Sequence, residues 1–106
     1  MKIRKPGEIW LADLGLAAKP RPVLVVSRAD PDPPRVLYIY VPLTTQYRES
    51  QYEVALGKLP FMHAESAANV QGIGSIPDAR FIRKLGQLPS EKLEAVKEAI
   101  LFAIDH

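Results

Sequence analysis

Ten prolines are spread along this chain of 106 residues, and they constrain the fold more than any other feature. Proline fixes the backbone angle φ and cannot donate a hydrogen bond, so it interrupts helices and is excluded from the middle of a sheet. The segment at residues 30–34, Asp-Pro-Asp-Pro-Pro, therefore cannot be regular structure. This spread predicts many short elements joined by tight loops rather than a helical bundle, in a single domain over residues 1–106.

Short apolar and aromatic segments between the prolines predict a set of β-strands. We expect strands at residues 8–14, 22–27, 36–42, 52–56, 66–71, 73–76 and 81–88, the last of them interrupted at Gly86. The segment 22–27 is apolar on both faces, which is typical of a central strand. Strands at short spacing with turn residues between them predict a small closed barrel.

The last segment of the chain changes to a helical period. Apolar residues recur there at spacings of three and four, at Leu93, Val96, Ile100, Leu101 and Ile104. After the start signal at Pro89 this pattern predicts an amphipathic helix that lies on the barrel and buries one stripe. The fold class that we expect is therefore mainly β (α+β).

Composition limits the possible chemistry and location. The chain has no cysteine, which excludes disulfide bonds and thiolate metal sites. It has no apolar run near the ~18 residues of a membrane span and no signal-peptide pattern, so we expect a cytoplasmic protein with no membrane partner. The net charge is only +2, but Arg80, Arg83 and Lys84, with Lys19 and Arg21, form a basic set compatible with an anionic partner.

Two strand ends carry polar groups that could act together. Arg21 stands at the entrance of one apolar strand, and Thr44 and Thr45 follow the exit of another. Buried strands hold whatever lies just outside their ends rigidly. Arg21 and Thr44 could therefore face one phosphodiester, although an ordinary strand entrance and exit would look the same.

The order of the short motifs identifies a family. The chain carries Gly7-Glu8-Ile9-Trp10, Arg21-Pro22-Val23-Leu24-Val25-Val26-Ser27, Val41-Pro42-Leu43-Thr44-Thr45, Gln71 and Lys84-Leu85-Gly86, followed by the amphipathic helix. In this order, over Gly7 to Ile104, the motifs resemble the MazF/PemK-type toxins of bacterial type II toxin–antitoxin systems. Each motif alone would be weak, and the specificity comes from their order.

The resemblance implies a small SH3-like β-barrel with a C-terminal helix, working as a homodimer. It also implies a sequence-selective endoribonuclease that cleaves single-stranded RNA without a metal or cofactor and leaves 2′,3′-cyclic phosphate and 5′-hydroxyl ends. A cognate acidic antitoxin would block the RNA groove. The catalytic pair of the family corresponds to Arg21 and Thr44 in this chain.

The chain departs from the family pattern in two places, which concern a catalytic acid and the choice of RNA sequence. Some members use an acidic residue directly before the glutamine, but Val70 precedes Gln71 here, with Asn69 before it. The loop at residues 15–20 is also shorter than is common in the family. The RNA sequence preference of other family members therefore cannot be assumed for this chain.

The expected chemistry depends on which groups can ionise. Arginine stays protonated, so Arg21 is better suited to clamp a phosphate than to act as a general acid. Thr44 is a poor base and would instead orient the 2′-hydroxyl by hydrogen bonding. His63 lies in a loop-like stretch away from the motifs, and His106 ends the chain, so we expect neither to be catalytic.

Other residues have both a functional and a plain interpretation. The candidate RNA contacts are Thr45, Gln46, Gln71, Arg80, Arg83 and Lys84, which could equally be solvated surface residues. Trp10, Tyr38 and Tyr40 could stack bases, although packing in the core or in a dimer is favoured for Trp10. Asp78 could pair with Arg80 or replace the missing acid.

Two other functions stay open. A barrel that has lost cleavage could still bind RNA or an antitoxin, and Val70 in place of an acid favours that alternative. By analogy of fold alone, the chain could instead poison DNA gyrase. The presence of both Arg21 and Thr44 favours the enzyme.

Overall fold

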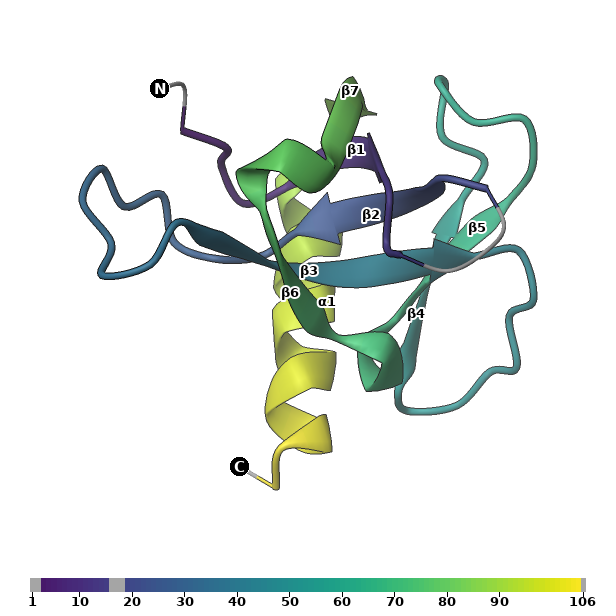
Figure 1. Cartoon of the computed structure of the whole chain (residues 1–106). Coiled ribbons are helices and arrows are strands. Elements are labelled where there is room, and N and C mark those ends of the chain that lie inside the picture. The colour runs from purple at the N-terminus through teal and green to yellow at the C-terminus, as the bar shows by residue number, and fades with distance from the viewer. Residues whose placement is uncertain (1–2, 16–18, 106) are drawn as a thin grey trace.

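The computed structural model describes residues 3–15 and 19–105 of the chain. Within these ranges the fold consists of antiparallel strands followed by one helix (Figure 1). The strands are β1 Glu8–Ala12, β2 Arg21–Val25, β3 Leu37–Thr44, β4 Glu53–Gly57, β5 Ser66–Asn69, β6 Gly74–Pro77 and β7 Phe81–Gln87, and the α-helix is α1 Ser90–Ala103. The predicted mainly β fold with a C-terminal helix is confirmed.

The strands form one curved sheet in the order β4-β5-β3-β2-β1-β7. The long strand β3 organises it: one edge pairs with β2, and the other pairs with β6 in its first half and with β5 in its last two residues. Within the described residues the outer strands β4 and β7 do not pair with each other, so the sheet is barrel-like but open, and the predicted closure of the barrel is wrong.

Hydrophobic side chains fill both faces of the central strands. Ile9, Leu24, Val41 and Leu43 pack with Val96 of α1 in a first core. Figure 1 shows α1 running across this face, behind β2 and β3. On the other face Val23, Val25, Tyr38, Ile76 and Phe81 form a second core. Because β2 is covered on both sides, as predicted, Arg21 at its first position is held by a rigid strand.

Two element boundaries differ from the prediction for local reasons. The strand predicted at 66–71 ends at Asn69, whose side chain accepts a hydrogen bond from the Gln71 N–H and starts a 3₁₀ turn over Val70–Gly72. Gly86 does not interrupt β7 but lies inside it, after an irregular register opposite β1. The ring of Phe61 occupies the space that a side chain at position 86 would need, which explains the glycine.

The helix buries less than its periodicity predicts. Val96 and Ala99 are buried, while Leu93 and Ile100 are half-buried. Leu101 and Ile104 are 42% and 64% exposed, so their predicted burial is wrong. The C-terminal end of α1 extends beyond the sheet (Figure 1), and Leu101 is covered only in part, at a groove that it lines with Ile39 and Ile73.

Two further sequence predictions concern residues at the limits of the structure. Half of the loop expected at 15–20, namely residues 16–18, lies outside the described residues, as does His106. In the part of the chain that is described, no helix is long and apolar enough to span a membrane.

Candidate active site

The pairing of β2 with β3 brings Arg21 and Thr44 to the same end of the sheet. Val23 is opposite Pro42, and Leu24 is opposite Val41. Continuing this register places Arg21 directly across from Thr44, where side chains of neighbouring strands lie on the same face. Arg21 is exposed, so its side chain does not serve the core.

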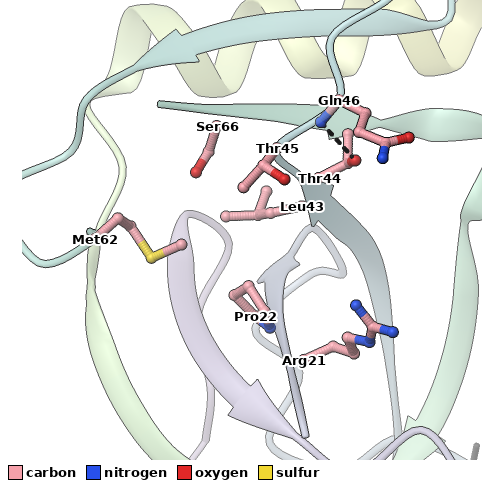
Figure 2. Close-up of a pocket in the computed structure, with 8 residues that line it drawn as sticks. All are labelled: Arg21, Pro22, Leu43, Thr44, Thr45, Gln46, Met62 and Ser66. Carbon is pink, nitrogen blue, oxygen red and sulfur yellow. Dashed lines mark hydrogen bonds between the residues drawn. The ribbon is translucent and has the colours of Figure 1, made fainter. Parts of the chain in front are cut away.

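A surface cavity of about 340 Å³ opens at this point. It is lined by Arg21, Pro22, Leu43, Thr44, Thr45, Gln46, Met62 and Ser66 (Figure 2). Figure 2 shows the Arg21 guanidinium on one side of this first cavity and the side chains of Thr44 and Thr45 on another. A cation and hydroxyl groups around one cavity are suited to bind a phosphodiester. Met62 and Ser66 complete the lining. Neither belongs to a sequence motif, so the sequence did not indicate them as site residues.

Thr44 is held in a defined orientation by the turn that follows β3. The Gln46 backbone N–H donates a hydrogen bond to Thr44 Oγ1 over 3.0 Å, drawn as the dashed line in Figure 2. Because the hydroxyl oxygen accepts this bond, its own proton remains available to donate to a ligand. The same bond fixes the start of the loop that carries Gln46.

A second cavity, of about 330 Å³, shares Thr44 and Gln46 with the first. Its lining is polar and consists of Thr44, Gln46, Arg48, Ser50, Tyr52, Glu53, Asn69 and Gln71. Gln71 reaches this second cavity because the Asn69 Oδ1 accepts the Gln71 N–H over 3.1 Å. Val70, between them, points into the core and is 1% exposed.

The sequence has no acidic residue directly before Gln71, but the fold brings the carboxylate of Glu53 to the same cavity. Strand β4 pairs with β5 so that Glu53 lies opposite Asn69, and Glu53 lines the second cavity. Nothing in the linear pattern pointed to Glu53, because only the pairing of β4 with β5 brings it to Gln71.

Glu53 also organises the loop between β3 and β4. Its Oε1 accepts hydrogen bonds from the backbone N–H groups of Arg48 and Ser50, at 3.2 and 3.3 Å, and from Ser50 Oγ at 2.9 Å. Desolvation acts to raise the pKa of Glu53, but the hydrogen bonds from Ser50 and Arg48 and the Arg48 charge outweigh it, and the pKa is lowered. The carboxylate is therefore ionised near neutral pH.

The three basic candidates that follow β6 lie apart from both cavities. Arg80 forms an ion pair with Asp13 at 3.7 Å, and Lys84 forms one with Glu8 at 3.8 Å. Arg83, on β7, makes no ion pair with any residue that the structure describes. Strand β1 lies between β7 and β2, so the backbone of β7, which carries Arg83 and Lys84, is about 10 Å from that of β2. Arg80 precedes β7, in a 3₁₀ turn over Asp78–Arg80.

Asp78 does not pair with Arg80 and does not reach the first cavity. Its Oδ1 accepts a hydrogen bond from Arg4 Nη2 over 2.7 Å. The Arg4 guanidinium in turn lies over the rings of Trp10 and Phe81, at 4.1 and 4.2 Å from their centroids. Asp78 and Trp10 thus belong to a cluster around Arg4, and Trp10 packs against the second core, which agrees with the packing role favoured for it.

The remaining candidates are placed as follows. Tyr38 is buried in the second core, so it offers no face to a base. Tyr40 is half-buried and lines a shallow cavity next to Arg21. His63 is exposed and is not among the described residues that line either cavity. No three His, Cys, Asp or Glu side chains of the described ranges lie close enough together to hold a metal ion.

Comparisons with known proteins agree with this architecture. Residues 5–104 match the family described as PemK-like, MazF-like toxin of type II toxin–antitoxin system. The chain is 31% identical over 101 residues to the probable endoribonuclease MazF5 of Mycobacterium tuberculosis, covering 93% of this chain and 91% of that protein.

Solved structures extend the likeness. The Mycobacterium tuberculosis toxin MazF-mt6 is 28% identical, with a TM-score of 0.80, over 92% of this chain and 96% of that one. An endoribonuclease from a mycobacterial species, solved in complex with its cognate antitoxin, shares the fold with a TM-score of 0.83 at 22% identity. That alignment covers 96% of this chain and 95% of the other.

Proposed function

The chain belongs to the PemK-like, MazF-like toxins of type II toxin–antitoxin systems, and from this premise we propose that it is a metal-independent endoribonuclease that cleaves single-stranded RNA at short sequences. One relative that it resembles, MazF5, is a probable endoribonuclease. One observation carries the proposal: the β2–β3 pairing sets Arg21 and Thr44 around a single cavity.

The proposed reaction is an internal transfer at one phosphodiester. The 2′-oxygen bonds to phosphorus and the bond to the 5′-oxygen breaks, which leaves a 2′,3′-cyclic phosphate and a 5′-hydroxyl. The 2′-hydroxyl loses a proton and the 5′-oxygen gains one, and solvent water carries both, because Arg21 stays protonated and Thr44 is a poor base. No water is consumed in the step.

Each of the two residues has a separate role in this scheme. Arg21 clamps the phosphate through its planar guanidinium, and the contact strengthens as negative charge builds in the transition state. Thr44, whose oxygen is held by the Gln46 N–H, directs its hydroxyl to the ribose and orients the 2′-hydroxyl. Because the site has no general base in this scheme, its rate of RNA cleavage should be low.

RNA and an acidic antitoxin are the partners that we propose for the same surface. The related endoribonuclease solved with its cognate antitoxin supports an antitoxin partner. Arg83 and the other exposed cations on the sheet suit either the phosphates of RNA or the carboxylates of an antitoxin tail. The two ligands should therefore compete.

We further propose a homodimer through an apolar face beside α1. Three exposed apolar side chains, Ile39, Ile73 and Leu101, line one groove there of about 660 Å³. An exposed apolar groove of this size supports a protein interface. Sedimentation equilibrium should give the mass of a dimer, and Leu101→Glu should shift it toward the monomer.

The activity test is incubation of the purified protein with a long RNA in EDTA, followed by primer extension. We expect discrete cleavage sites and 5′-hydroxyl ends. Cleavage that requires added Mg²⁺ or Mn²⁺ would contradict the mechanism. A folded protein that cuts none of the RNAs but binds them would instead be a binding module that has lost cleavage.

A further inference from the structure

The second cavity, beside Arg21 and Thr44, has the chemistry of a nucleobase pocket. We propose that it holds one of the two bases that flank the scissile phosphate and that Glu53 makes it select a base with an amino group over uracil. This inference rests on the proposed function and adds a specificity-determining residue to it.

The position of the cavity relative to the first one fits a single nucleotide step. The two cavities share Thr44 and Gln46, so a phosphate beside Arg21 has its neighbouring base within reach of the second. The volume of about 330 Å³ lies at the small end of the range for pockets that bind small organic groups.

The lining is suited to the edge of a base. Gln46, Asn69 and Gln71 contribute amide side chains, which can donate and accept hydrogen bonds as the edges of bases require. Tyr52 adds an aromatic ring whose position is set by packing against Phe102 of α1, at 5.2 Å between ring centroids. Single-stranded RNA is commonly recognised by this combination of polar edges and aromatic faces.

The carboxylate decides what kind of ligand enters. A negative charge in the lining disfavours the phosphate backbone, so the second cavity should receive the base while Arg21 holds the phosphate. Arg48, which also lines the cavity, offsets part of that charge.

The hydrogen bonds of Glu53 determine which base is preferred. Oε1 already accepts three hydrogen bonds, from the N–H groups of Arg48 and Ser50 and from the Ser50 hydroxyl. Oε2 remains, and an ionised carboxylate can only accept. Adenine, cytosine and guanine present an amino group to such an acceptor. Uracil presents carbonyl oxygens on both sides of its one N–H, and these are repelled. A discrimination of about 5- to 100-fold is expected from one such contact.

The decisive variant is Glu53→Gln. Its amide oxygen can replace Oε1 as the acceptor for the loop, while its NH₂ group replaces Oε2 and donates instead of accepting. The preference for amino-bearing bases should fall by about 5- to 100-fold, with uracil sites gaining relative to the others. Glu98→Gln, an exposed residue of α1, makes the same change of charge as a matched control. Gln71→Ala, also at an exposed position, should weaken the preference without disturbing the β3–β4 loop that Glu53 holds.

The experiment is cleavage of an RNA library randomised around a mapped site, with the 5′-hydroxyl ends sequenced. We expect a preference in the wild type and in Glu98→Gln that Glu53→Gln relaxes. If the wild type cleaves and all variants show its preference, this inference is wrong and the proposed function stands. If the wild type cuts nothing, the proposed function fails, and binding of short RNAs that differ at one base tests the pocket. If the wild type and Glu53→Gln show equal base preferences in that binding assay, the inference about the base pocket is also wrong.

Discussion

Replacing Arg21 by alanine separates catalysis from folding. Arg21 is the exposed first residue of β2, and its backbone pairs with Ala12 of β1 whatever the side chain. The substitution should change the free energy of unfolding by no more than about 0.5 kcal/mol, as is usual for exposed positions. For a domain of this size that corresponds to a shift in Tm of about 2–4 °C.

The effect on cleavage should be far larger. Losing one preorganised contact to a developing negative charge costs about 2.7–4 kcal/mol, which is about 100- to 1000-fold in rate. The lower end applies if water partly replaces the guanidinium in this open cavity. Arg21→Lys should recover little, because an ammonium group cannot contact two phosphate oxygens in the planar arrangement of arginine.

The assay is single-turnover cleavage of a labelled RNA with one mapped site, in EDTA. Arg35→Ala is the matched control, since Arg35 is an exposed arginine in the loop at the other end of the β2–β3 hairpin. It removes the same charge without touching the first cavity. The reasoning is refuted if Arg21→Ala cleaves within about tenfold of the wild type, or if Arg35→Ala loses as much activity.

Four further outcomes are expected. Thr44→Val should lose nearly as much cleavage as Arg21→Ala, and Thr44→Ser should keep most of it, because serine retains the acceptor for the Gln46 N–H and a proton to donate. His63→Ala should leave the rate and its pH profile unchanged, and a large loss would identify a base that the scheme lacks. In a titration of labelled RNA from 50 to 300 mM salt, Arg83→Ala should reduce the log–log slope by about 0.7 without altering sequence preference, whereas an unchanged slope would mean that Arg83 contacts no phosphate. Because the pKa of Glu53 is lowered on folding, its carboxylate stabilises the protein above the ordinary pKa of a glutamate, and this contribution is lost as the pH falls through the lower folded value. The difference in Tm between wild type and Glu53→Gln should accordingly be constant from about pH 6 to 8 and shrink below about pH 4, and a difference that grows in acid would contradict the sign.

Local patterns in the sequence were sufficient for the fold class, and they placed Arg21 and Thr44 at the ends of two strands. Proline spacing and period-two segments predict short strands, and the change of period predicts the helix, because both depend on neighbouring residues. Arg21 and Thr44 lie across from each other because of the register between β2 and β3, which the sequence alone leaves open since β2 is apolar on both faces.

Tertiary structure alone decided the rest of the site. Glu53 lies beside Asn69 only because β4 pairs with β5, and Asp78 meets Arg4 across 74 residues of sequence. Leu101 belongs to the apolar period of α1 but stays 42% exposed, whereas Val96 is buried in the first core. Periodicity states which face of an element is apolar, whereas the partner of each side chain depends on how distant elements pack against one another.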